Sequence, residues 1–420
     1  MFDKLRFLLR RLKKQLWVKP LVMSFMSIFG AFLAKAADRL QLERYVPEIT
    51  VESVETLLKI IAASMLVMAI FAVGSMVSAY ASASSTATPR AFPLVIADDV
   101  SQNALSVFIG AFIFSLVGLF ALLNSFYGPA GLFTLLLLTT LVFIIVILTF
   151  LRWVDSIARL GRLGATIDKV ESATATAMER RRNAPTLQGS SIAGHPAPQH
   201  IVHANSIGYV QQINMGDLQA IVEDLDGYMQ VAALPGTCAS PGQPLAFFSH
   251  LTEGQEIAFK DKIASAFIIG KDRTFEDDPR FGLVVLSEIA GRALSTGIND
   301  PGSAISVIGS LVRLFVGWSK PTEEKSAPET HFDRVMVPEL RLADMFDDAF
   351  TAIARDGAGA IEVVVRLQKG LAALAASENR EVADCTKRHS RIALARAKSA
   401  LNLPQDVETA ENSADLAAVS

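Results

Sequence analysis

The chain has 420 residues, 51% of them hydrophobic and only 19% charged. Ordinary cores cannot hide so many apolar side chains, so this composition excludes a disordered chain and a simple soluble domain. The net charge of −3 gives no electrostatic basis for a nucleic-acid partner. Cys238 and Cys385 belong to no CxxC or Cys/His cluster, so we expect neither a disulfide framework nor a metal site.

Four apolar stretches predict membrane-spanning helices, roughly residues 21–34, 57–81, 104–126 and 130–151. A helix needs about 20 mostly apolar residues to cross the hydrocarbon core, and the last three stretches meet this requirement. The first stretch is shorter, and its basic leader and the small residues Ala34 and Ala36 also fit a cleaved signal peptide. We favour a retained helix, because the later helices insert without a cleaved signal.

Basic residues flank the apolar region on both sides. Residues 1–19 contain seven Lys or Arg and one acidic residue, and after the fourth stretch come Arg152, Arg159, Arg162, Lys169, Arg180, Arg181 and Arg182. By the positive-inside rule both flanks belong in the cytoplasm, as an even number of crossings requires. The sequence therefore predicts a multipass membrane protein whose N- and C-termini are cytoplasmic.

Changes of composition divide the chain into segments. We expect a mainly α membrane protein, with a basic cytoplasmic N-terminus (1–19), a transmembrane domain of about four helices (20–152) and a cytosolic α+β domain. The cytosolic part is predicted to comprise a juxtamembrane helix (153–182), a linker rich in Pro, Gly and Ser (183–199), a small β-rich module (200–270), a helical bundle (271–401) and a disordered acidic tail (402–420). The juxtamembrane helix either pairs with copies of itself or lies on its own domain.

The cytosolic segments also show individual helix signals. A capping-box pattern at Thr252 starts one helix, and two more begin at Asp278 and Asp300. A loop over 320–330 then separates these helices from two long ones, roughly 339–376 and 379–401.

Residues 270–304 hold the most specific pattern in the sequence. Asp278 and Asp300 stand where N-caps stand, and each is followed by a proline, Pro279 or Pro301, at the first helical position. Gly297 suits the left-handed residue that ends a helix. Capping by itself thus accounts for these residues.

Capping does not account for Asp272, Arg273, Asp277 or Asn299, which add charged and amide groups beside the two helix N-termini. Together with Asp300 they form a candidate ligand site. Arg273 can bind a carboxylate or phosphate with both arms of its guanidinium, and the acidic side chains can hold a divalent cation. The alternative is a purely structural joint between two capped helices.

Several motifs carry a family resemblance. RTFEDDPRFG (273–282) and IAGRALSTGINDPGSA (289–304), with SSTATPRAF (84–92) and GYVQ…PGTCASPGQPLA (208–246), resemble a family of bacterial predicted inner-membrane proteins catalogued as a domain of unknown function. The resemblance covers most of the chain, from the first helix to about Ala376, although Thr296 stands where the family more usually has proline. It implies a multipass helical domain in the bacterial inner membrane and a cytoplasmic C-terminal domain, and it implies no established activity.

The sequence contains no Walker loop, GxSxG, HExxH or GxGxxG pattern, so we expect no catalytic residue, no cofactor and no enzyme activity. The leading hypothesis is a channel or transporter of a small solute or ion, with a cytosolic domain that assembles or gates it. We expect a homo-oligomer, because four helices per chain are few for a transport pathway. The alternative is a membrane-anchored sensor or scaffold whose cytosolic domain binds a ligand or partner. A third hypothesis is a membrane enzyme that uses Asp272, Arg273, Asp277 and Asp300, but no nucleophile–base pair or metal-ligand spacing supports it.

Overall fold

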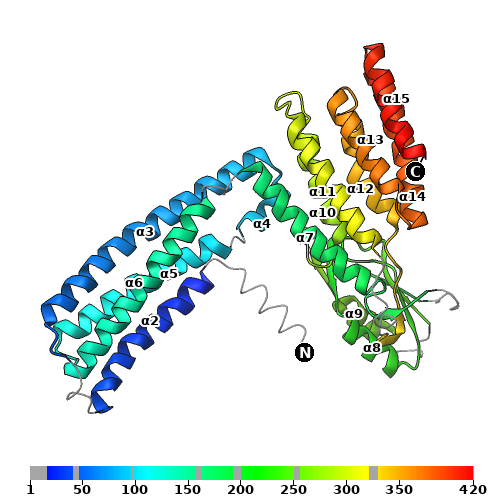
Figure 1. Cartoon of the computed structure of the whole chain (residues 1–420). Coiled ribbons are helices and arrows are strands. Elements are labelled where there is room, and N and C mark those ends of the chain that lie inside the picture. Colours follow the sequence, from blue (N-terminus) through cyan, green and yellow to red (C-terminus); the bar gives the residue numbers. More distant parts are fainter. Residues whose placement is uncertain are drawn as a thin grey trace. The chain divides into compact units, whose positions relative to one another are not determined.

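The computed structural model of the chain is mostly helical and describes residues 17–40, 47–96, 99–157, 162–192, 200–249, 256–320 and 330–419 (Figure 1). It divides into two compact units, Met1–Ala165 and Thr166–Ser420, and we describe each by itself.

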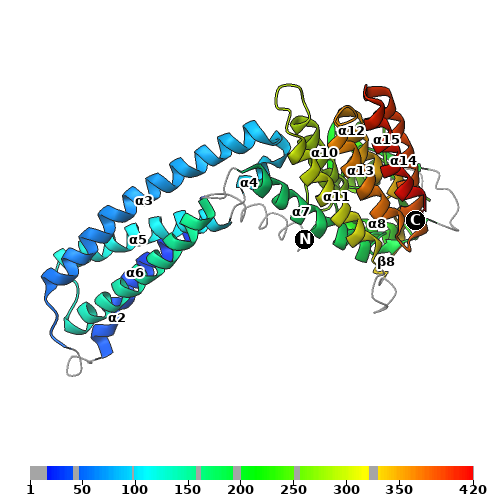
Figure 2. The ribbon, with the colours of Figure 1, turned by 45° about the horizontal axis from the view of Figure 1, so that its top comes forward.

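The first unit is a bundle of long apolar helices. Its elements are α2 (Val18–Ala37), η1 (Asp38–Leu40), α3 (Val51–Thr86), η3 (Pro89–Ala91), α4 (Phe92–Ile96), α5 (Asp99–Leu123) and α6 (Pro129–Ile157). Helix α5 packs against α2, α3 and α6, so it forms the centre of the bundle (Figure 2). Phe108 and Trp153 meet edge to face in its core, with ring centroids 5.9 Å apart.

The outer surface of this bundle is apolar as well. Phe29, Ile70 and Phe120 are each more than 60% exposed, which a water-soluble bundle would not tolerate over so many side chains. Among the described residues, five helices are long and apolar enough to cross a membrane: α2, α3, α5, α6 and, in the second unit, α11 (Pro301–Ser319). Length and composition therefore support a membrane protein with several apolar helices.

Asp38 ties the end of α2 to the start of α6. Its carboxylate accepts hydrogen bonds from the backbone N–H groups of Gly128 (2.8 Å) and Gly131 (2.6 Å), where a helix N-terminus favours negative charge. A Cβ atom at either glycine would lie within 3 Å of a carboxylate oxygen of Asp38, so neither position has room for a side chain. The local sequence carries no signal for this contact, because the partners lie some 90 residues apart.

The second unit combines a β-rich part with a helical bundle. Two sheets, with strand orders β1-β8-β4-β6-β2 and β5-β3-β7, enclose a core that includes Leu218, Met229 and Leu245. The elements of this part are β1 (Gly189–Ser190), β2 (His200–His203), β3 (Gly208–Ile213), α8 (Met215–Asp224), β4 (Met229–Val231), β5 (Cys238–Ala239), β6 (Pro244–Phe248), α9 (Glu256–Ala266), β7 (Phe267–Gly270) and β8 (Phe332–Met336).

Strands β1 and β8 correct the predicted segment boundaries. Strand β1 lies in the stretch that we predicted to be a linker, and β8 lies inside the predicted helical bundle. The two strands pair in parallel with each other, and β8 also pairs with β4. Such short strands are stable only through partners distant in the sequence, so no local pattern reveals them. The predicted cap at Thr252 lies outside the described residues.

The helical bundle contains α7 (Leu163–Asn183), α10 (Pro279–Ala293), α11, α12 (Leu342–Asp356), α13 (Ile361–Ala375), α14 (Arg380–Ala400) and α15 (Pro404–Val419). Helices α10 to α15 lie side by side, and the β-rich part gathers toward one end of them (Figure 1). The predicted long helix 339–376 is wrong, because the chain turns at Gly357 and forms α12 and α13 instead. The turn needs glycine there, since a Cβ atom would lie 2.6 Å from Val363.

The predicted disordered tail is also wrong, because residues 404–419 form α15. Ala410 is fully buried in a cluster with Val364 of α13 and Ala397 of α14. The tail looks disordered by composition because it is acidic and has few large apolar residues. Its small residues Ala410, Ser413 and Ala414 nevertheless lie at helical spacing, and they form the stripe that packs.

Candidate functional site

The two predicted N-caps occupy the starts of α10 and α11. Asp278 accepts a hydrogen bond from the backbone N–H of Phe281 (3.1 Å), and Asp300 accepts one from that of Ser303 (3.0 Å). Pro279 and Pro301 are the first helical residues. These contacts satisfy backbone donors that have no partner within their own helix.

The predicted role of Gly297 is wrong. Helix α10 ends at Ala293, four residues earlier, and the left-handed residue of the following turn is Asn299, with φ of 51°. Asparagine tolerates this conformation better than most residues, so the glycine is not needed for it. The side chain of Asn299 is exposed.

Arg273 pairs with Asp278. Its guanidinium donates from Nε (2.7 Å) and Nη2 (3.0 Å) to the two carboxylate oxygens, and it lies 5.3 Å from the centroid of the Phe281 ring. Asp278 is only 2% exposed. Burial raises the pKa of the Asp278 carboxyl, while the hydrogen bonds from Arg273 lower it. The glycine at position 236, with φ of 94°, leaves space for this carboxylate.

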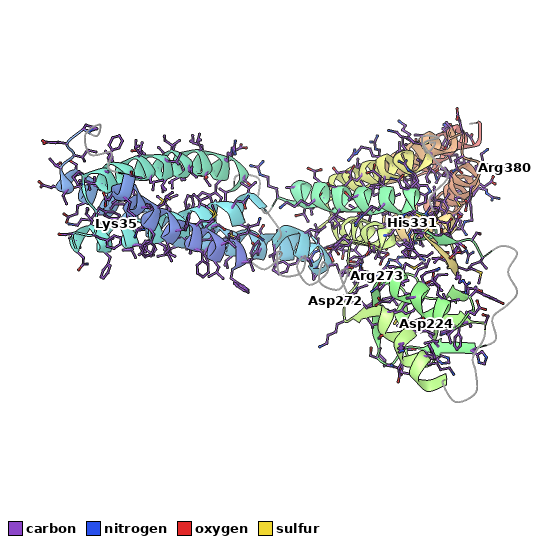
Figure 3. The ribbon with its side chains drawn as sticks, turned by 90° about the horizontal axis from the view of Figure 1, so that it is seen from below. Lys35, Asp224, Asp272, Arg273, His331 and Arg380 are labelled. Carbon is purple, nitrogen blue, oxygen red and sulfur yellow. The ribbon has the colours of Figure 1, made fainter. Side chains whose placement is uncertain are left out.

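The five predicted ligand residues do not meet. Arg273 and Asp277 lie at the start of α10, whereas Asn299 and Asp300 follow its end, so the 15 residues of α10, about 22 Å, lie between them. Asp272 stands beside Arg273 (Figure 3), and its backbone carbonyl accepts a hydrogen bond from Gln211 (2.7 Å). The described residues include no group of three His, Cys, Asp or Glu side chains that would hold a metal ion. The predicted joint site is therefore wrong as an assembled constellation.

A different arginine, Arg181, stands out by its burial. It ends the buried stripe of α7, which consists of Thr166, Ile167, Val170, Thr174, Ala177, Met178 and Arg181. Its side chain is 4% exposed, and neither Nη1 nor Nη2 donates a hydrogen bond to any residue within the described ranges. Burial lowers the pKa of this guanidinium to about 10, an effect that the Asp277 and Asp278 carboxylates oppose.

Arg181 lines a surface cavity of about 320 Å³ at one end of the bundle. Arg182 and Lys320 add two more positive charges to its walls, and Glu339 adds one negative charge. Trp318 supplies an aromatic ring, and Asn379, the N-cap of α14, adds an amide group. The cavity volume falls at the lower end of the range for small-molecule sites.

The neighbouring arginines of α7 have structural partners. Arg182 donates a hydrogen bond to the backbone carbonyl of Gly317 near the end of α11. Arg180 donates to the carbonyl of Glu276, and its Nη1 lies 3.7 Å from a carboxylate oxygen of Asp277. Among the described residues both Nη groups of Arg181 lack a hydrogen-bond partner, whereas in Arg182 only the buried Nε lacks one. A buried guanidinium without such partners is costly, and this cost points to a ligand.

The position of Arg181 in the sequence also indicates its burial, although we used its positive charge only to predict the membrane topology. Successive helical residues are about 100° apart, so three consecutive arginines cannot all face water on a helix that packs. Arg181 follows Met178 by three residues and Ala177 by four, which places it on the apolar stripe. The arginine that continues the stripe is the one to examine as a functional residue.

Comparison with known proteins identifies the family of this chain. The model of a family of predicted membrane proteins, DUF2254, matches residues 13–373. Uncharacterized proteins of Mycobacterium tuberculosis and Mycobacterium bovis are 30% identical over 118 residues, which cover 25% of this chain and 20% of each relative. The chain thus matches about a fifth of the length of these relatives, and no solved structure matches it. Because the family model spans most of the sequence, the resemblance seen in the motifs is confirmed, and the chain belongs to the DUF2254 family of predicted membrane proteins.

Proposed function

We propose that this protein is a membrane-anchored sensor of the bacterial inner membrane, in which four helices span the bilayer and the second unit binds a small anionic ligand in the cytoplasm. The observation that carries the proposal is Arg181, a buried residue in the wall of a cationic cavity whose Nη1 and Nη2 have no hydrogen-bond partner among the described residues. The cavity belongs to one chain, so the function does not require the homo-oligomer that the sequence suggested.

We assign four spans to the first unit and treat α11 as a helix of the cytosolic bundle. Val307, Leu311 and Phe315 on one face of α11 are buried. On another face Arg313 donates two hydrogen bonds to Glu171 of α7, at 2.7 and 2.6 Å. A helix with one buried apolar face and one face carrying an ion pair fits a protein core better than a bilayer.

A sensor fits the spans better than the channel hypothesis does. No Asp, Glu, Lys or Arg stands in the central turns of α2, α3, α5 or α6. The buried hydroxyls of Ser106 and Thr139 donate hydrogen bonds to backbone carbonyls of their own helices, so these hydroxyls do not line a path for an ion. The described part of the bundle thus provides no evident hydrophilic path. The enzyme hypothesis fails because its residues lie at opposite ends of α10.

The test is a melting series on the full chain in detergent, with inorganic phosphate as the probe anion. Phosphate should raise the melting temperature of the parent protein. Arg181→Met should melt at the parent's temperature without phosphate or above it, because an apolar side chain of similar length removes a buried charge whose Nη1 and Nη2 lack hydrogen bonds. The same variant should not respond to phosphate.

The matched control is Arg180→Met, which changes the neighbouring residue of the same helix by the same amount. Arg180 does not line the cavity, so this variant should respond to phosphate like the parent. If phosphate shifts no melting curve and Arg181→Met melts well below the parent, Arg181 has a structural role and the proposed sensor is wrong.

A further inference from the structure

We infer that the ligand of this cavity is a nucleoside monophosphate, a phosphate ester that carries hydroxyl groups and a flat aromatic base. This inference rests on the proposed function and names the class of its ligand. It follows from three kinds of residue that line the same cavity: the cationic Arg181, Arg182 and Lys320, the aromatic Trp318 and the acidic Glu339.

The cationic residues define the phosphate end. Arg181 and Arg182 are adjacent on the last turn of α7, and Lys320 directly follows α11. A guanidinium matches the oxygens of a phosphate with a planar fork of donors, and a lysine adds a point charge. Nη1 and Nη2 of Arg181 are buried and make no hydrogen bond to described residues, so their donor capacity is unused.

Trp318 argues against an inorganic anion as the natural ligand. It lies in the last turn of α11, is only partly buried and lines the cavity. An aromatic wall gives little to a small hydrated anion, whereas it stacks on the face of any nucleobase. A phosphate carried by a planar ring uses both the cations and the indole.

Glu339 favours a ligand that carries hydrogen-bond donors as well as a negative charge. Glu339 lines the same cavity, and a carboxylate there would repel a bare phosphate. A carboxylate accepts hydrogen bonds from sugar hydroxyls, as acidic residues do at the ribose in dinucleotide sites. A ribose between base and phosphate therefore gives the carboxylate a partner. A cavity of about 320 Å³ suits a mononucleotide and is small for a dinucleotide.

The experiment is a competition series on the full chain in detergent, read by intrinsic fluorescence and by melting temperature. The probes are adenosine monophosphate, uridine monophosphate, ribose 5-phosphate, adenosine and inorganic phosphate. Both nucleotides should bind at least about tenfold more tightly than ribose 5-phosphate or phosphate, because only they gain the stacking contact. They should also quench fluorescence, which Trp318 reports for the second unit because the other tryptophans, Trp17 and Trp153, belong to the first.

Two variants of Trp318 separate stacking from charge. Trp318→Leu should abolish the preference for nucleotides over ribose 5-phosphate and leave phosphate binding unchanged. Trp318→Phe keeps a ring, so it should keep the preference while most of the quenching disappears. Glu339→Gln should weaken nucleotide binding several-fold without weakening phosphate binding, since it removes the repulsion together with the hydroxyl contact.

The possible failures are distinguishable. If phosphate and ribose 5-phosphate bind as tightly as the nucleotides and Trp318→Leu changes nothing, the nucleotide inference is overturned while the anion sensor stands. If no probe, inorganic phosphate included, binds to the parent chain, both the inference and the proposed function are overturned.

Discussion

Two aspartates with the same sequence role differ because of what surrounds them. Asp278 and Asp300 each cap a helix that begins with proline. Asp278 is nearly inaccessible and accepts two hydrogen bonds from the guanidinium of Arg273, whereas Asp300 accepts hydrogen bonds from the backbone N–H and the hydroxyl of Ser303. Hydrogen bonds from Ser303 lower the pKa of Asp300, while burial raises that of Asp278. The loss of stability on substitution should therefore be larger at Asp278 than at Asp300.

Asp278→Asn and Asp300→Asn test this difference with the same chemical change. Asparagine caps a helix as well as aspartate does, so Asp300→Asn should change the free energy of unfolding by about 0.5 kcal/mol or less. Asp278→Asn leaves the guanidinium of Arg273 without its counter-charge, and we expect a loss of about 3 kcal/mol. Melting curves of the full chain in detergent should therefore shift for Asp278→Asn and not for Asp300→Asn. Equal shifts would contradict the assigned environments.

At the scale of elements, α15 shows how an acidic segment becomes a helix when a partner surface exists. The cluster of Val364, Ala397 and Ala410 joins it to α13 and α14. Lys398 of α14 also forms an ion pair with Glu411 of α15. An isolated 16-residue helix is marginal in water, so packing on the bundle supplies much of its stability.

Ala410→Glu tests whether α15 packs on the bundle. It places a charge at a position with no exposure, and the free energy of unfolding should fall by about 2 kcal/mol or more. Thr409→Glu, one residue earlier and on the exposed side of the helix, should change it by about 0.5 kcal/mol or less. Limited proteolysis should cut the tail faster in Ala410→Glu only. A disordered tail would make both variants melt and cleave like the parent.

At the scale of the whole molecule, the number of spans decides on which side the chain ends. The basic flanks favour a cytoplasmic position for both residues 1–19 and the region after α6. Four spans keep the C-terminus in the cytoplasm, whereas a fifth span through α11 would move it to the other side. The buried apolar face and the Arg313–Glu171 ion pair of α11 support four.

Alkaline phosphatase fusions test the proposed topology. A fusion after Gly128, between α5 and α6, should be active because this turn would face the periplasm. Fusions after Asn183, at the end of α7, and after Ser420 should both be inactive because they would remain in the cytoplasm. Activity of the Ser420 fusion alone among these two would show that α11 crosses the membrane. Activity of both would reverse the orientation of the whole bundle.

The sequence by itself determined the family and the apolar helices, because both follow from patterns along the chain. Runs of apolar residues predict α3, α5 and α6 without knowledge of their neighbours. The capping residues Asp278 and Asp300 contact backbone groups three positions away, so their role is also local. Strands β3, β6 and β7 are also predictable from the sequence, because β-branched and aromatic residues stand between turn residues there.

Only the tertiary structure decided which polar groups meet and which segments find partners. In the folded chain Arg273 pairs with Asp278, and Asp300 lies at the far end of α10. Arg181 is buried in the wall of a cavity. The tertiary structure also pairs β8 with β1 across more than 130 residues and packs α15 against α13. Each of these contacts joins groups whose separation in sequence says nothing about their distance in space. Burial and ion pairing depend on that distance, so the fold had to be known before the candidate site became visible.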